Sequence, residues 1–317
     1  MILNYILIFI SLVLFSGLAV DAGLLEWRYL QLQGAAKSAA VASSMALQRG
    51  GTQATVKASG QAAASANGYT NALGGVTVTI DNPPLSGSYT GNNAALKATI
   101  TQAAPTTFLG ILGMGKVNMQ AQSLQLKPTV VNLASYFNVN AMYTDGTTFS
   151  SAGGFDSGGN SLSASFMGQV RSSNNLGPII SWRGNLFYLG PPNTQNGAAN
   201  TTINLPNGQY SQLQMLASTA NGPFNGQTYV VTYTDTNKTT ATQDFSDWCY
   251  PIGNPGESMV SQSSYRNVYS GGNAPCSRAA TITVYGYSMN LDNTKTVKTL
   301  TLPATPKIVL LALDLVP

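Results

Sequence analysis

The chain begins with MILNYILIFISLVLFSGLAV (residues 1–20), an apolar run that continues without a break into DAGLLEWRYLQLQGAAKSAA (residues 21–40). About twenty apolar residues in a helix are enough to cross a bilayer core of about 30 Å. The second stretch contains no proline, and good helix formers dominate it as far as residue 48. Together they predict one helix from about Met1 to Gln48, roughly 70 Å long at 1.5 Å per residue.

Three interpretations of the apolar run compete. A secretory signal peptide fits the small residues near Ala19, but the run has no basic residue before it and exceeds the usual 7 to 15 apolar residues. A permanent membrane anchor conflicts with the positive-inside rule, because the first basic side chains, Arg28 and Lys37, follow the run. A pilin-like segment resolves the conflict if a short basic leader is removed before Met1. Such a segment lies in the membrane first and is later buried among identical helices.

Both sides of the predicted helix are apolar in its second half. One face carries Leu25, Tyr29, Leu32, Ala36, Ala39, Ala40 and Leu47, and the opposite face carries Trp27, Leu30, Gly34, Val41 and Met45, interrupted by Lys37. A helix with two apolar faces needs packing partners on both of them. We expect the assembly helix to act through Met1, Asn4, Tyr5, Phe9, Phe15, Asp21, Glu26 and Arg28. Asp21 is expected at the membrane–water interface, and Arg28 to pair with it between subunits rather than within one helix.

These residues resemble the TadE/TadG-like family of pseudopilins. The resemblance rests on Asp21, Gly23, Arg28, Leu32, Gln33, Ala35, Ala36, Ala39 and Ala40. It continues through VTVTIDNPP and the segment from ALKATITQ to NMQAQSL, so that it covers about residues 1–126. Two positions depart from the family pattern: Lys37 stands where Asp is usual, and Tyr5 where many pilins carry Glu. Asn4 is able to accept a hydrogen bond from a neighbouring N-terminal amine, but it cannot neutralise the charge.

The pattern after the helix predicts an α+β fold with three parts. Residues 1–49 form the hydrophobic assembly helix, residues 50–128 a small α/β pilin-like module, and residues 129–317 a jelly-roll-type β-sandwich. In the module, an Ala-rich helix within 50–66 is followed by strands at 76–80, 94–102 and 116–126 and by a short helix at 105–112. Sandwich strands are expected at 161–167, 179–189, 201–205, 209–218, 227–235, 239–245, 281–291, 296–302 and 307–315. Asn-Gly pairs at Asn207, Asn221 and Asn225 predict turns.

The sandwich region, above all YTDTNKTTATQDFSDW (residues 233–248), resembles galactose-binding-like domains. This resemblance concerns the fold and implies little about a ligand.

Composition favours a chain that lies outside the cell rather than in the cytosol. Charged residues make up 8% of the 317, against roughly 25% in ordinary soluble domains. The net charge of +4 is spread thinly, so nucleic acid is not an expected partner. Cys249 and Cys276 favour a disulfide over free thiols in that setting.

The chemistry-bearing side chains disfavour an enzyme. The chain has no histidine, the commonest general base and metal ligand. Asp235, Asp244 and Asp247 lie close in sequence and suggest either a carboxylate pair or a calcium site, but a structural role is favoured, with Asp235 in a turn and Asp247 capping a loop. No cofactor is expected, and bound calcium is kept only as an alternative.

Several aromatic side chains are available to stack on sugars or to fill the core. Core packing is favoured for Trp182 and Trp248, whereas Tyr250, Tyr265 and Tyr269 lie in a loop-rich region and are the better glycan-contact candidates.

We therefore expect a pilin-like subunit of an extracellular cell-surface filament that forms homo-oligomers through its helix and is inserted in the inner membrane before assembly. One alternative is a minor membrane-anchored pseudopilin that assists assembly of another pilus. Another is a membrane-tethered carbohydrate-binding or adhesion protein.

Overall fold

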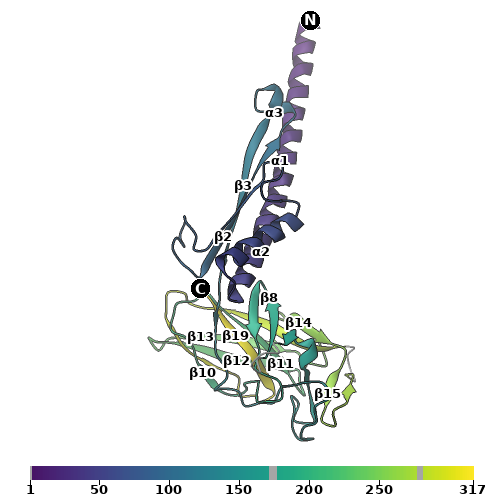
Figure 1. Ribbon diagram of the computed structural model, residues 1–317, viewed down its shortest axis with the longest axis vertical. Helices are drawn as coiled ribbons and strands as arrows, with labels where there is room; N and C mark the ends of the chain where they lie inside the picture. The colour runs from purple at the N-terminus through teal and green to yellow at the C-terminus, as the bar shows by residue number, and fades with distance from the viewer. Residues whose placement is uncertain (1, 171–176, 277–280) are drawn as a thin grey trace. The chain divides into compact units, whose positions relative to one another are not determined.

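A computed structural model describes residues 2–170, 177–276 and 281–317 (Figure 1). The chain forms two compact units, Met1–Lys127 and Pro128–Pro317. The first contains a long helix and a small sheet, and the second consists of β-strands, so the predicted α+β fold is confirmed.

The helices of the first unit begin and end at residues suited to those positions. Helix α1 spans Ile2–Gln48, and the chain leaves it through Gly50, whose positive φ of 77° suits a residue without a side chain. Helix α2 spans Gln53–Ala66, and its N-cap Thr52 accepts a hydrogen bond from the Thr55 amide.

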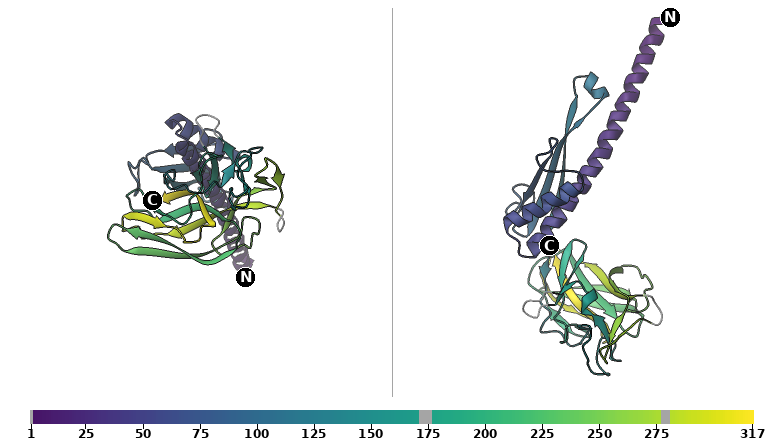
Figure 2. Two further views of the ribbon diagram at one scale, coloured as in Figure 1. Left: turned by 90° about the horizontal axis from the view of Figure 1, so that it is seen from below. Right: turned by 45° about the vertical axis from the view of Figure 1, so that its right-hand side comes forward.

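A three-stranded antiparallel sheet completes the first unit. Its strands are β1 (Thr77–Asp81), β2 (Ala95–Pro105) and β3 (Lys116–Leu126), in the order β1-β2-β3. The short helix α3 (Phe108–Ile111) lies in the β2–β3 connection. Figure 2 shows β2 and β3 running beside α1, with α3 at the far end of the hairpin. A single core joins α1, α2 and the sheet.

The second unit is built on two antiparallel sheets. The five-stranded sheet has the order β14-β17-β11-β19-β4, with β14 at Ser258–Ser263, β17 at Ile282–Asn290, β11 at Gln212–Thr219, β19 at Ile308–Val316 and β4 at Thr129–Val130. The four-stranded sheet has the order β10-β18-β12-β13, with β10 at Thr202–Asn204, β18 at Val297–Thr301, β12 at Phe224–Tyr233 and β13 at Lys238–Phe245. Tyr229, Tyr233 and Tyr287 are among the side chains buried between the two sheets.

Smaller elements cover the other face of the five-stranded sheet. They are β5 (Met142–Tyr143), β6 (Asn160–Ser163), the 3₁₀ turn η1 (Ala164–Phe166), β7 (Gln169–Val170), β8 (Pro178–Trp182), β9 (Asn185–Tyr188), β15 (Arg266–Val268) and β16 (Asn273–Ala274). A second core, which includes Phe155, Phe187 and Trp248, lies between them and the sheet. The central strands are therefore buried on both faces.

Three predicted features of the sandwich were wrong in detail. The single strand at 179–189 is the hairpin β8–β9, because Arg183 and Gly184 both adopt positive φ and form a tight turn. The strand predicted at 161–167 ends at Ser163 and continues as the 3₁₀ turn η1. Asn225 and Gly226 do not join two strands but lie inside β12, where the register with β13 shifts.

Candidate assembly surface

One stripe of α1 is buried within its own unit. Leu32, Ala36 and Ala39 are fully buried in the core that α1 shares with α2 and the sheet. Their spacing of three and four residues places them on one side of the helix. Gly60 of α2 approaches this side so closely that a Cβ on it would lie 2.2 Å from the Ser43 Oγ. Small side chains at this crossing therefore serve packing inside the unit.

Asp21 lies on the same stripe, and its carboxylate binds the start of α3. The Thr107 amide donates to Oδ1 at 3.0 Å, and the Phe108 and Leu109 amides donate to Oδ2 at 2.8 and 2.7 Å. The hydrogen bond from Leu109, helped by those from Thr107 and Phe108, lowers the pKa of Asp21, although burial acts in the opposite direction. Since the first amides of a helix have no acceptor within it, one carboxylate satisfies three of these donors.

Arg28 holds the other side of the same loop. Its Nη1 donates to the carbonyl oxygen of Pro105 at 3.0 Å. A carboxylate and a guanidinium on α1 thus bind opposite ends of residues 105–109, and we call this arrangement the clamp. The sequence did not predict these partners within the chain. A signal was present, because a helix predicted to start at Pro105 needs an acceptor for its first amides.

Gly17 provides space for the clamped loop. A Cβ on Gly17 would lie 2.2 Å from the Phe108 ring, so the ring packs directly on the helix backbone. Beside this contact is an open apolar cavity of about 300 Å³, lined by Leu12, Val20 and Phe108 among others.

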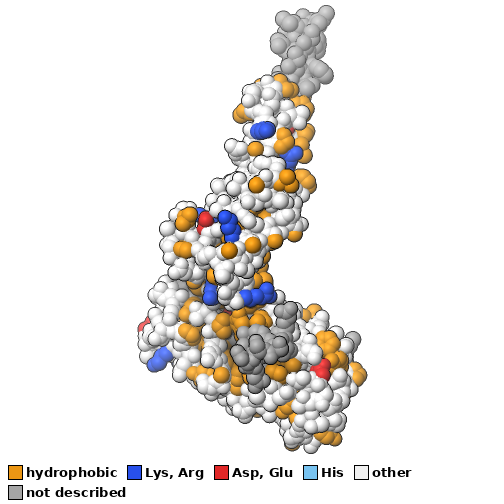
Figure 3. Space-filling view, in the orientation of Figure 1, with side chains coloured by type: hydrophobic (Ala, Val, Ile, Leu, Met, Phe, Trp, Pro, Cys, Tyr) orange, Lys and Arg blue, Asp and Glu red, His pale blue; other side chains and the backbone are white. Residues whose placement is uncertain are grey.

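Most large apolar side chains between residues 12 and 30 of α1 lie outside the buried stripe and are exposed. They are between 43% and 73% exposed: Leu12, Phe15, Val20, Leu24, Trp27, Tyr29 and Leu30. We call these seven residues the open face. Figure 3 shows hydrophobic side chains along the described part of the first unit, which contains α1. The exposed side chains Ile111, Leu112 and Met114 lie at and just beyond the end of α3.

The predicted assembly residues divide into three groups. Phe15 and Glu26 are exposed, whereas Asp21 and Arg28 form the clamp. Met1 and the side chains of Asn4, Tyr5 and Phe9 lie outside the described part of the chain. Among the residues that are described, no helix combines the length and the apolar character needed to span a bilayer.

In the second unit, the three aspartates considered for calcium have separate local partners. Asp244 accepts a hydrogen bond from the Gly226 amide, and Asp247 accepts from the Gly222 and Cys249 amides. Within residues 2–170, 177–276 and 281–317, no acidic or cysteine side chains gather into a group that could hold a metal ion.

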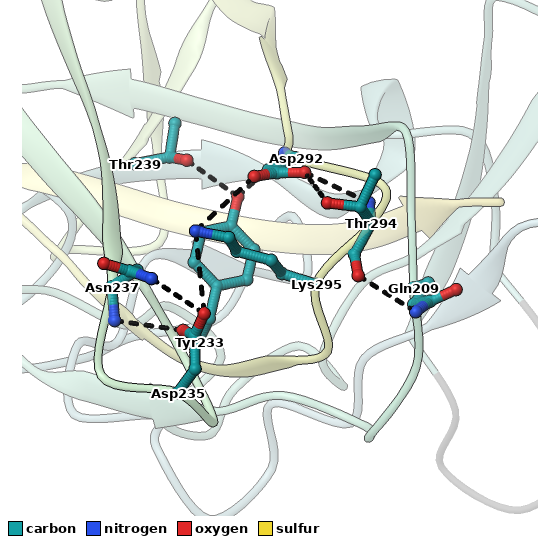
Figure 4. A network of polar contacts seen from close by, with 8 residues as sticks. All are labelled: Gln209, Tyr233, Asp235, Asn237, Thr239, Asp292, Thr294 and Lys295. Atoms are coloured by element: carbon teal, nitrogen blue, oxygen red, sulfur yellow. Dashed lines mark hydrogen bonds and ion pairs between the residues drawn. The ribbon is translucent and has the colours of Figure 1, made fainter.

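Asp235 belongs to a polar network that joins two turns (Figure 4). Lys295 lies 3.6 Å from Asp235 and 3.7 Å from Asp292, and so links the β12–β13 turn to the connection between β17 and β18. Asn237 donates to Asp235, and this hydrogen bond lowers the Asp235 pKa. Because the groups satisfy one another, the network stabilises turns.

The candidate glycan-contact tyrosines have different surroundings. Tyr265 donates a 2.6 Å hydrogen bond to Asp145, which makes it part of the fold. Tyr250 and Tyr269 are each 46% exposed, and only Tyr250 lines one of the described cavities. Trp248 is buried against Phe155, in agreement with core packing.

The predicted disulfide is confirmed. Cys249 and Cys276 are bonded, and both are buried beside Trp248 in the second core. The bond therefore closes the loop-rich part of the sandwich.

Comparison with known proteins concerns the second unit. No TadE/TadG-like match is found for the N-terminal residues, and no curated protein matches the chain. A family model described as an AziU2-like beta-sandwich domain matches residues 127–317, which coincide with the sandwich unit. The chain belongs to the AziU2-like beta-sandwich domain family.

Proposed function

We propose that the chain is a pilin-like structural subunit of an extracellular filament. In this proposal α1 packs against α1 helices of other copies, and the β-sandwich lies on the outside. Before assembly, the apolar residues 1–20 would be held in the inner membrane.

The open face of α1 carries the proposal. The buried stripe of the helix already has its partner in α2 and the sheet, while the seven large side chains of the open face stay 43% to 73% exposed. Burying each of them is worth about 1.5–3 kcal/mol, so their gross contribution is on the order of 10 kcal/mol. A second copy of the helix offers the same apolar surface, and head-to-tail contacts that do not close extend into a helical filament.

The clamp supports this arrangement. Asp21 and Arg28 use their charges within the chain, so neither charge is left on the open face. Glu26 and Lys37 remain exposed, and they lie at positions that are free to pair between subunits.

Electron microscopy of negatively stained material sheared from producing cells tests the proposal. Leu30→Glu should abolish filaments, because it replaces a large apolar side chain of the open face with a carboxylate, one helical turn from the exposed Glu26. Leu30 is 58% exposed, so the subunit itself should still fold. Leu85→Glu is the matched control, since Leu85 is 77% exposed in the same unit but lies outside α1.

Filaments that persist with Leu30→Glu, or a chain found only as membrane-bound monomers, would contradict the proposal. The resemblance to TadE/TadG-like proteins favours a second function, that of a minor pseudopilin which assists another pilus. Subunit stoichiometry separates the two, because a major subunit dominates the mass of purified fibres.

A further inference from the structure

A polar cavity of about 360 Å³ opens in the β-sandwich, and none of its lining residues is used in the filament proposal. Its volume lies in the range of small-molecule binding sites. The lining side chains that matter here are Asp156, Asn221, Asp247, Tyr250 and Arg266.

Two carboxylates in the lining are held in place by backbone amides. Asp247 accepts from the Gly222 amide at 2.8 Å and from the Cys249 amide at 2.8 Å. Asp156 accepts from the Gly158 amide at 2.7 Å, from the Asn160 amide at 3.0 Å and from the Asn160 side-chain amide at 2.7 Å, which leaves about one of its acceptor positions for a ligand. A carboxylate has about four lone-pair positions, so a fixed carboxylate is a preorganised acceptor.

Arg266 supplies donors on the same cavity. Its guanidinium lies 5.8 Å from the Trp248 ring centroid, and its Nη1 has a long contact of 3.8 Å with the Cys249 Sγ. Among the described residues it forms no ion pair, and its Nε is buried without a hydrogen-bond partner. A guanidinium with five N–H donors and so few protein acceptors suits a ligand rich in oxygen.

Tyr250 adds an aromatic surface to this site. Its side chain is 46% exposed and lines the cavity beside the disulfide. An exposed ring next to fixed polar groups offers one apolar face for stacking, together with hydrogen bonds around it.

We propose that this cavity binds a neutral saccharide ring. Sugar hydroxyls both donate and accept, so they match the Asp156 and Asp247 carboxylates as well as the Arg266 guanidinium. The Asn221 Nδ2 donates to the Asp156 carbonyl oxygen at 3.2 Å, and its side-chain oxygen is a further acceptor for a hydroxyl. The apolar C–H face of a pyranose matches the Tyr250 ring. Among the described residues, the Asp156 and Asp247 carboxylates are offset by the Arg266 guanidinium and by the Lys307 ammonium, which donates to the Asp156 carbonyl oxygen at 2.8 Å, so no excess charge favours a sugar that carries a carboxylate or sulfate. The proposal does not depend on filament formation.

A glycan array probed with the full chain tests the proposal, in a detergent without a sugar headgroup. We expect binding to glycans that end in a neutral hexose, and competition by one of the free sugars glucose, galactose or mannose. Tyr250→Ala should weaken the binding about tenfold, as expected for the loss of an aromatic stack. Tyr269→Ala is the matched control, because Tyr269 is equally exposed but does not line the cavity.

Arg266→Gln provides a second readout, since it shortens the side chain and removes the guanidinium. We expect it to weaken binding while the sandwich remains folded, as judged by circular dichroism. An array without signal, binding restricted to acidic glycans, or equal losses in Tyr250→Ala and Tyr269→Ala would each overturn the proposal.

Discussion

The two units bury their apolar surface in different ways. The five-stranded sheet of the sandwich is covered on both faces, by the four-stranded sheet on one side and by shorter elements on the other. Helix α1 is covered on one stripe, and its open face stays exposed along the described residues. A unit whose core is fully covered can present a binding site on its surface. A helix with an exposed apolar face is expected to bury that face against a partner.

The same contrast extends to buried charge. In the sandwich, Asp314 of β19 is 1% exposed, and neither carboxylate oxygen has a hydrogen-bond partner among the described residues. In the first unit, Asp21 is 2% exposed, but its carboxylate accepts hydrogen bonds from three backbone amides. Burial alone favours the protonated form of an aspartate, and hydrogen bonds to the carboxylate favour the charged form.

The largest expected effect is at Asp314. Burial raises its pKa to about 8, from an ordinary value of 3.8. A raised pKa in the folded state means that stability falls as pH rises from about 4 to about 8 and then levels off. The loss is on the order of 5 kcal/mol at most, since each unit of pKa corresponds to about 1.4 kcal/mol. Asp314→Asn should remove this slope and make the sandwich more stable at pH 8.

Urea unfolding of the full chain at several pH values, followed by tryptophan fluorescence, measures this effect because Trp182 and Trp248 both belong to the sandwich unit. Trp27→Phe in the background removes the signal from α1. Asp235→Asn is the control. The Asn237 hydrogen bond lowers the Asp235 pKa, so Asp235 does not titrate between about pH 4 and pH 8, and replacing Asp235 should leave the stability slope in that range unchanged. Parallel pH profiles for the wild type and Asp314→Asn would show that Asp314 is ionised in the fold.

A smaller effect is expected where α1 packs against α2. Gly60→Ala places a Cβ 2.2 Å from the Ser43 Oγ and 2.7 Å from the Ile80 Cδ1. Overpacking of this kind costs about 1–3 kcal/mol. Gly34→Ala is the opposite case, because no atom lies within 4 Å of its added Cβ and alanine favours a helix by about 1 kcal/mol.

Hydrogen exchange of the full chain separates the two glycine substitutions. Gly60→Ala should speed exchange of β2 amides, and Gly34→Ala should slow it or leave it unchanged. The amides of β19 belong to the other unit and should not respond. If both substitutions accelerate exchange in β2, the packing of α1 is tighter on its open side than we infer.

The sequence predicted those features that depend on periodicity and composition. Helix α1 followed from an unbroken run of helix formers, and most sandwich strands from alternating residues. The β8–β9 hairpin was missed because Arg183-Gly184 is a weak turn signal inside an apolar run. The clamp was missed because Asp21 and Leu109 lie 88 residues apart, and only the folded β2–β3 hairpin brings them together.

The proposed saccharide cavity could not be predicted from a sequence pattern. Tyr250 was recognisable as an exposed aromatic residue, but Asp156 and Arg266 carry no motif that would place them beside it. The residues that line a cavity come from loops that are distant in sequence and adjacent in the fold. A single sequence does not indicate which loops lie side by side.

The smallest expected effect is local and has the opposite sign to that at Asp314. Asp21→Asn leaves one carbonyl oxygen to serve three amides, so exchange at residues 107–109 should rise about tenfold while the rest of the unit stays protected. Because hydrogen bonds lower the Asp21 pKa, the carboxylate stabilises the clamp above its ordinary pKa near 4. In the wild type this protection should persist from pH 8 to pH 5, and it should disappear only as pH falls through the lowered value. Asn at position 21 should show no such acid transition. A transition that survives in Asp21→Asn would assign the acid sensitivity to a group other than Asp21.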